Sequence, residues 1–186
     1  MNIQLTGREA HKIAALAAFA DRDTGSSNHA IEIVAANGRF AAYSGSGRIA
    51  ALLEVDADPI PDADQHPSVT LPARDLAKAL RGIPVNGVCQ ITVTEAAWSV
   101  GGINVNVSGA WAKLAPTARA IFDSAFSLPT RTSSPSVEVP REFVPALRAV
   151  SVTGREHGPW TFRVAGTKTR HAVIAETGRF SAVALS

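Results

Sequence analysis

The sequence predicts an α+β fold built from three copies of one unit, in which an extended segment leads into a helix and antiparallel strands follow. An arginine followed by an acid opens a helix-like pattern at Arg8-Glu9, Arg74-Asp75 and Arg141-Glu142, so the pairs lie 66 and 67 residues apart. Apolar residues recur with a helical period after each pair, and segments with alternating apolar residues follow. Chance easily produces three such dipeptides, so the shared spacing and order of elements carry the prediction.

Length and composition limit the classes of protein to which this chain can belong. The 186 residues are 46% apolar with a mean hydropathy of +0.08, which suffices for a buried core. The single cysteine, Cys89, excludes an intrachain disulfide and a thiolate metal site, and its apolar neighbours predict a buried thiol in a reducing compartment. The first residues lack a signal-peptide pattern, and no stretch approaches the ~20 apolar residues that span a bilayer. We therefore expect a soluble, cytoplasmic protein without membrane contact.

Each predicted helix is amphipathic. The first, residues 8–20, stacks Ala10, Ile13, Leu16, Ala17 and Ala20 on one face. The second, residues 73–81, follows Pro72, which suits a helix start, and buries Leu76, Ala79 and Leu80. The third, residues 141–150, buries Phe143, Leu147 and Val150, although Pro145 falls in its first turns.

The opposite face of each helix carries cations. They are Arg8, Lys12, Arg74, Lys78, Arg81, Arg141 and Arg148. The acid of each pair lies near the helix N-terminus, where the macrodipole favours negative charge. The net charge is only +2, so nucleic-acid binding depends on where the cations lie. A solvated face explains one such stripe, but its recurrence in three helices makes a binding face an equal alternative.

Strands with period-two alternation follow each helix. The first group, residues 31–33 and 39–43, flanks an Asn37-Gly38 hairpin signal. The second comprises residues 89–93, 98–100 and 103–107, with a turn at Gly101-Gly102. The third comprises residues 160–164, 170–174 and 180–185, with turns near Gly166 and Gly178. The three tryptophans and most phenylalanines are expected in the core.

Segments rich in turn-forming residues divide the chain. Residues 56–67 are acidic and proline-rich, and residues 128–136 are rich in Pro, Ser and Thr. We expect a complete domain at residues 1–125, made of unit one (residues 1–62) and unit two (residues 63–125). A linker at residues 126–135 then leads to unit three, residues 136–186.

Motifs of catalysis are weak in this sequence. The five histidines are scattered, with no spacing typical of metal ligands. The run Gly45-Ser46-Gly47 lacks the Lys-Ser/Thr of a P-loop and favours a hairpin turn over phosphate binding. We therefore expect no enzyme activity, no catalytic or metal site and no cofactor.

Two segments resemble a known family. The entry to the second helix reads Val69-Thr70-Leu71-Pro72-Ala73-Arg74-Asp75-Leu76, and a strand, glycine turn and strand run from Val173 to Leu185. With the opening strand and helix, these segments resemble the bacterial DNA polymerase III beta subunit, the replicative sliding clamp. The glycine turn of that family reads Ala-Thr-Asp-Gly-His-Arg-Leu-Ala, against Ala175-Glu176-Thr177-Gly178-Arg179-Phe180-Ser181-Ala182 here. The match is partial, and three units correspond to a half-length clamp.

The resemblance implies the DNA-clamp fold, with antiparallel sheets outside and basic helices lining a central hole. The cations named above would then face duplex phosphates without reading sequence, which suits sliding. It also implies a DNA polymerase and a clamp loader as partners. Gly178, Arg179 and Phe180 occupy the turn that contributes to the family's peptide pocket, although the third domain that completes this pocket is missing and Phe180-Ser181 replaces Arg-Leu.

Two functional interpretations remain open. The first is a processivity factor that encircles DNA as a homo-oligomeric ring; since rings of this family contain twelve units and this chain offers three, a tetramer is favoured over a dimer. Its exposed sheet edges would pair between subunits, with third units joined to each other. The second is a clamp-fold interaction module that forms no ring and competes for or modulates replication partners.

Overall fold

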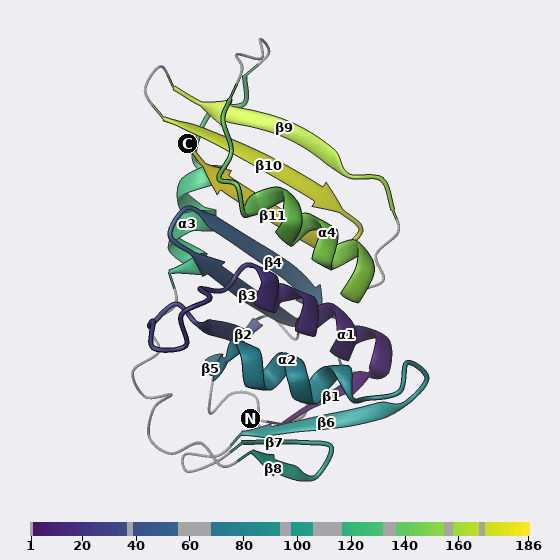
Figure 1. The fold of residues 1–186 in the computed structure, drawn as a ribbon. Helices are drawn as coiled ribbons and strands as arrows, with labels where there is room; N and C mark the ends of the chain where they lie inside the picture. Colours follow the sequence, from purple (N-terminus) through teal and green to yellow (C-terminus); the bar gives the residue numbers. More distant parts are fainter. Residues whose placement is uncertain are drawn as a thin grey trace.

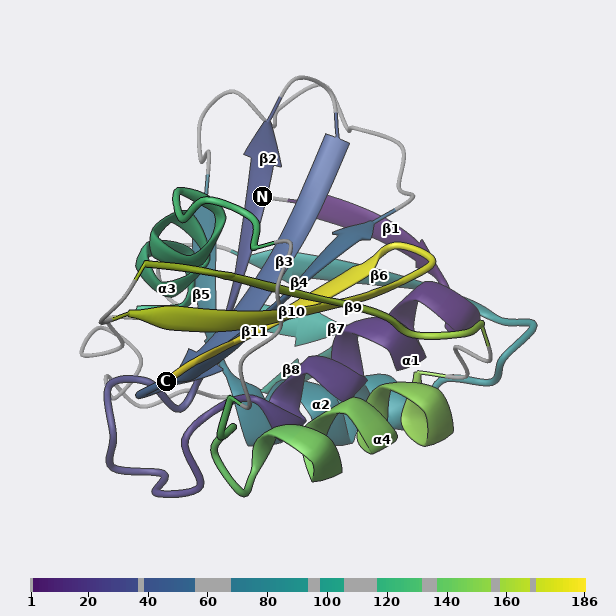
Figure 2. The same cartoon turned by 90° about the horizontal axis from the view of Figure 1, so that it is seen from above.

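The computed structural model describes residues 2–36, 39–55, 68–93, 98–105, 117–131, 137–154, 158–167 and 170–186. Within these ranges, helices α1 (Gly7–Ala15), α2 (Ala73–Arg81) and α4 (Phe143–Thr153) lie in one layer on the same side of two antiparallel sheets (Figure 1). Helix α3 (Ala118–Phe126) lies on the opposite side (Figure 2). The described helices therefore form two unequal layers around the sheets.

The strands of the described residues divide between a small and a large sheet. The small sheet has the order β1 (Asn2–Thr6), β6 (Val88–Val93), β7 (Trp98–Val100) and β8 (Ile103–Val105). The large sheet has the order β5 (Ser68–Pro72), β2 (Ala30–Ala36), β3 (Arg39–Ser46), β4 (Ile49–Val55), β11 (Phe180–Leu185), β10 (His171–Thr177) and β9 (Thr161–Gly166). The α+β class with antiparallel sheets is confirmed.

Units one and two exchange their first strands. Strand β1 leaves unit one and pairs with β6 of unit two, with Leu5 opposite Cys89. Strand β5 leaves unit two and pairs with β2 of unit one, with Leu71 opposite Ile31. Because each unit completes the sheet of the other, α1 and α2 are held side by side over a shared core.

Unit three joins the large sheet through its last strand. Strand β11 pairs with β4, with Ala182 opposite Ala51, and α4 packs against α1. The β3–β4 and β10–β11 hairpins turn through the same dipeptide, Gly47-Arg48 and Gly178-Arg179, with glycine φ values of 57° and 53°. This positive φ favours glycine. The repeated Gly-Arg turn is a second sign of the repeat, independent of the arginine-acid pairs.

The limits of two helices differ from the predicted ones: α1 spans Gly7–Ala15 and not residues 8–20, and α4 spans Phe143–Thr153 and not residues 141–150. Helix α1 ends at Ala15 and continues as a 3₁₀ turn, Leu16–Ala18. Helix α4 begins at Phe143, because residues 140–143 form a turn in which the Phe143 N–H donates to the Pro140 carbonyl at 2.9 Å. Arg141 therefore lies before α4, whereas Arg8 and Arg74 are each the second residue of their helices.

Helix termini follow local chemistry. Thr6 caps α1, since its Oγ1 accepts the Glu9 N–H at 3.2 Å. Pro145 is the third residue of α4, where the backbone N–H has no intrahelical acceptor, so the missing donor costs no helix hydrogen bond. The proline that weakened the prediction of this helix is thus compatible with it.

Helix α3 was not predicted. Its Ile121, Phe122 and Ala125 pack on the face of the large sheet opposite the other helices, and the Phe122 ring meets Tyr43 edge-on at 6.3 Å. The large sheet is therefore covered on both faces in this region. Continuous apolar runs such as residues 49–53 and 182–185, in place of strict alternation, are the sequence signal of such double burial.

The aromatic residues and Cys89 follow the expected core in most places. Trp98 and Cys89 are buried, and burial raises the pKa of the Cys89 thiol. Trp160 is half-buried, and Trp111 lies outside the described residues, as does the Asn37-Gly38 turn. Phe126 and Phe162 are exceptions, with exposed fractions of 43% and 57%. No helix of the described residues is long and apolar enough to cross a membrane.

The start of α1 touches the loop that follows α2. The Gly7 N–H donates to the Gly87 carbonyl at 2.7 Å, and a Cβ at Gly7 would lie 1.9 Å from the Pro84 carbonyl oxygen. This contact requires glycine because the nearest atoms are backbone.

We expect Gly7→Ala to destabilise the fold by about 2 kcal/mol or more, since backbone must shift to admit the methyl group. Urea unfolding monitored by circular dichroism measures this. Gly82→Ala is the matched control at a helix end, where the added Cβ meets only the Ala79 carbonyl at 3.3 Å. Equal stability of the two variants would contradict the proposed close contact.

Candidate nucleic-acid interface

The side of the helix layer that faces away from the sheets is basic. Arg8 lies on α1, Arg74, Lys78 and Arg81 lie on α2, and Arg148 lies on α4; all five are exposed. Arg141 is exposed in the turn before α4. Because the three helices share one layer (Figures 1 and 2), these cations belong to one side of the molecule.

Lys12 differs from the other predicted cations. Its side chain is only 19% exposed, and its Nζ lies 3.5 Å from Oε1 of Glu9, itself largely buried. The other carboxylate oxygen, Glu9 Oε2, is buried without a hydrogen-bond donor among the described residues. Lys12 therefore compensates a buried carboxylate and adds little charge to the exposed face.

Two adjoining grooves cross this face. One, of about 380 Å³, lies between α2, the end of the first helix and the start of α4, and Arg74, Arg81 and Glu142 contribute to its wall. The other, of about 410 Å³, includes Arg141. Both are also lined by Asp21 and Arg22. The structure thus brings three predicted cations to the grooves, while Arg8, Lys12, Lys78 and Arg148 do not line them.

Asp21 and Arg22 were not identified from the sequence. They follow the first helix in the Asp-Arg-Asp run at residues 21–23, a pattern without a specific functional signal. A hydrogen bond from the Ser26 hydroxyl, together with the Asp23 N–H, holds the pKa of Asp21 below its usual range. Asp21 therefore remains anionic beside the arginines.

His29 is one of the five histidines whose spacing indicates no metal site. In the structure it positions the start of α2. Its imidazole is buried; Nδ1 donates to the Asp21 carbonyl at 2.6 Å, and Nε2 accepts the Arg74 N–H at 3.3 Å. The His29 carbonyl accepts the Ala73 N–H at 3.2 Å. Pro72, the residue before α2, provides no side-chain cap, so His29 supplies acceptors for two N–H groups of the first turn.

We expect His29→Ala to lower the free energy of unfolding by about 1–2 kcal/mol, because the Arg74 N–H loses its acceptor and a buried ring is removed. Thermal or urea unfolding measures this loss. Replacing the exposed Thr24 of the same loop by Ala is the control and should be nearly neutral. A His29→Ala variant as stable as this control would refute the capping role.

The turn expected to contact partners is only partly exposed. Gly178 and Arg179 form an exposed two-residue turn. Phe180 is 1% exposed and lies opposite Leu53 in the core. The exposed part of this turn is therefore Gly178-Arg179, and contact with a partner through Gly178, Arg179 and Phe180 stays a prediction.

The described part of the chain contains no candidate metal-binding site. No group of three or more His, Cys, Asp or Glu side chains lies close enough there to hold a metal ion.

Strand exchange between two units, with α1, α2 and α4 in one layer on the same side of antiparallel sheets, is the arrangement of the DNA-clamp class of fold. Solved structures of this class match the whole chain. A putative DNA polymerase III beta subunit from Eubacterium rectale matches with a TM-score of 0.67 and 11% identity, over 100% of this chain and 64% of that chain. A sliding clamp from Bartonella birtlesii bound to griselimycin matches with a TM-score of 0.65 and 12% identity, over 100% and 64%.

The beta subunit of Caulobacter crescentus polymerase III matches with a TM-score of 0.65 and 12% identity, over 99% of this chain and 64% of that chain. The chain therefore has the fold of bacterial DNA polymerase III beta subunits, and it spans less than two thirds of their length. No family model matches the sequence, and no curated protein matches it either.

Proposed function

We propose that this chain is a DNA sliding clamp or processivity factor, which surrounds duplex DNA as an oligomeric ring and tethers a polymerase or another DNA-processing protein. The observation that carries the proposal is the shared helix layer, which puts the exposed cations of α1, α2 and α4 on one side of the sheets. The resemblance to sliding clamps implies helices that face DNA, and the shared fold of the solved beta subunits supports that resemblance.

The chemistry of this face suits contact without sequence recognition. Long arginine and lysine side chains reach phosphates, whose positions do not depend on base identity. The grooves hold four arginines, Arg22, Arg74, Arg81 and Arg141, together with the acids Asp21 and Glu142. The partial compensation by these acids limits the strength of phosphate binding, which favours a mobile complex.

Replacing Arg74, Lys78 and Arg81 together by alanine should weaken DNA binding equally for unrelated duplex sequences. Loss of three phosphate contacts flattens the dependence of log affinity on log salt by up to about 2.7 units. Fluorescence anisotropy at several salt concentrations measures both effects.

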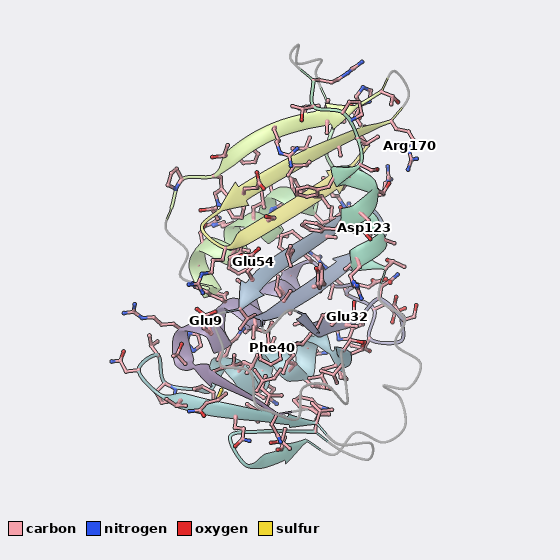
Figure 3. The ribbon with its side chains drawn as sticks, turned by 180° about the vertical axis from the view of Figure 1, so that it is seen from behind. Glu9, Glu32, Phe40, Glu54, Asp123 and Arg170 are labelled. Atoms are coloured by element: carbon pink, nitrogen blue, oxygen red, sulfur yellow. The ribbon has the colours of Figure 1, made fainter. Side chains whose placement is uncertain are left out.

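The matched control removes the same charge from the α3 side of the molecule. The comparison is between two pairs, Arg74 and Arg81 in the helix layer and Arg119 and Arg170 on the α3 side. Arg119 contacts Glu32 and Arg170 contacts Ser124, away from the helix layer; Figure 3 labels Glu32 and Arg170. Joint replacement of Arg119 and Arg170 by alanine should leave the salt dependence of DNA affinity nearly unchanged. Equal losses in the Arg74/Arg81 and Arg119/Arg170 double variants would show that net charge, and not the helix layer, determines binding.

The proposed ring requires self-association. Four chains of three units give twelve units, so we favour a homotetramer over a dimer, with polymerase and clamp loader as partners. Sedimentation equilibrium at micromolar concentrations should give the mass of a tetramer. A dimer would require a different closure, and a strict monomer would remove the ring.

One observation favours the alternative, a clamp-fold module without a ring that competes for or modulates replication partners. The outer edge of β9 is partly covered by the chain itself: Thr130 forms a bridge with Ala165, and the Arg131 N–H donates to the Val164 carbonyl at 3.0 Å. A covered edge is less available for pairing between subunits. The mass measurement separates the two functions.

A further inference from the structure

Units one and three can be compared residue by residue. Gly47 and Gly178 occupy the same hairpin turn, so equivalent positions differ by 178 − 47 = 131. The strand registers agree with this offset, because Ile31 lies opposite Ser44 and Phe162 lies opposite Ala175. Ile31 and Phe162 are therefore equivalent, as are Ile33 and Val164.

The equivalent residues differ sharply in burial. Ile31 is 0% exposed, whereas Phe162 is 57% exposed. In unit one, β5 pairs with β2 and α2 packs against it, so unit two covers this part of the sheet. In the part of unit three that the structure describes, α4 lies over β11 and no helix lies over β9 (Figure 1).

The uncovered area continues onto α4. Val144 and Val152 on this helix are 62% and 68% exposed, and Trp160, just before β9, is half-buried. Apolar side chains at these exposures on two adjacent elements form a patch of the kind that binds another protein surface. We call Val144, Val152, Trp160 and Phe162 the open face.

The first segment of unit three, residues 137–140, also lacks the strand partner that the equivalent segment of unit two has. Residues 69–72, Val-Thr-Leu-Pro, form the end of β5 and pair with β2, with Leu71 opposite Ile31 and Thr70 opposite Glu32. The matching residues 137–140, Val-Glu-Val-Pro, lie in no strand. Transferring the β5 register to unit three sets Val139 opposite Phe162 and Glu138 opposite Arg163.

The edge of β9 can accept such a segment over half of its length. The chain covers the other half, where the Gly166 N–H donates to the Pro129 carbonyl at 2.9 Å and Arg131 binds Val164. The segment Thr161 to Arg163 lies beyond this cover. Glu138 and Arg163 have opposite charges, so their cross-strand pairing is favourable; Arg163 now lies 3.7 Å from Glu176.

We infer that the open face binds a second copy of this chain, through its own unit three, in a two-fold arrangement that repeats the pairing of units one and two. Glu138 of each copy lies opposite Arg163 of the other, and the two α4 helices pack side by side. Because each unit three carries both the segment 137–140 and the open face, the contact is self-complementary. The inference builds on the proposed self-association but does not depend on DNA binding.

Disulfide trapping tests the register. In a Cys89→Ala background, Glu138→Cys and Arg163→Cys variants are purified separately and mixed in equal amounts under mild oxidation. A cross-linked heterodimer should form in the mixture and not in either variant alone, since two-fold pairing keeps like positions apart. Absence of the cross-link from a mixture that sedimentation shows to be associated would overturn the inference.

Sedimentation velocity tests the surface without cross-linking. Phe162→Glu and Val152→Glu should each raise the dissociation constant at least about tenfold, because a charge enters an apolar contact. Val88→Glu is the matched control, since Val88 is 63% exposed on unit two. Glu138→Arg and Arg163→Glu should each weaken association, and the double exchange should restore it to within about threefold.

The outcomes are distinct from those of the DNA experiment. A protein that stays monomeric up to about 0.1 mM, or one whose association is equally sensitive at Val88 and Phe162, would overturn the inference. Either result leaves the phosphate contacts of the helix layer to be decided by the arginine variants. Conversely, arginine variants with an unchanged salt dependence of DNA affinity would contradict the DNA proposal and leave the unit-three contact unaffected.

Discussion

The exchange of first strands between units one and two is the constraint on which the rest of the structure depends. Pairing of β1 with β6 and of β5 with β2 leaves each unit without a complete sheet of its own. The exchanged strands lead directly into α1 and α2, so their registers determine where both helices start. Thr6 and His29 then satisfy backbone N–H groups at these two starts, Thr6 as the residue directly before α1 and His29 from the loop before β2. The basic face is thus a consequence of sheet pairing, because the helices cannot rotate without breaking these contacts.

Unit three is joined to this body by a different contact. Antiparallel pairing of β11 with β4 extends the large sheet and brings α4 beside α1 without any exchange of strands. The same pairing aligns a third helix with the basic layer, and within the described residues no other unit covers β9 and the flank of α4. Helix α3 strengthens the junction from the other side, where Ile174, Val183 and Ala50 form one apolar cluster under it. The pairing of β11 with β4 thus places unit three firmly against unit one while its far side, at β9, stays exposed.

The sequence predicted elements whose signals are local. Apolar periodicity gave α2 its exact range, and glycine turns placed the hairpins, because both depend on residues close in the chain. Helix α3 was missed because its burial depends on the far side of a sheet that three units assemble together. The grooves were missed for the same reason, since Arg22 comes from a loop and meets Arg74 only after strand exchange. The resemblance placed Phe180 in a partner-binding turn but could not show that its ring is buried opposite Leu53, because that burial depends on the pairing of β11 with β4.

Charge placement adds a further constraint on how the helix layer interacts with phosphate. Residues 137–186 contain seven Lys and Arg and four Glu, so they contribute +3, whereas the remaining residues contribute −1 to the total of +2. The excess positive charge therefore lies in unit three, but the grooves also contain Asp21, whose carboxylate stays ionised through its hydrogen bonds. In the proposed complex, a phosphate that enters a groove meets this carboxylate and that of Glu142, while a phosphate at the exposed arginine tips meets mainly cations. Contact is consequently strongest at the flexible ends of the side chains, which can pass from one phosphate to the next with little change in energy. Under the proposed function, such an interface would retain DNA through the number of contacts and leave the protein free to move along the duplex axis.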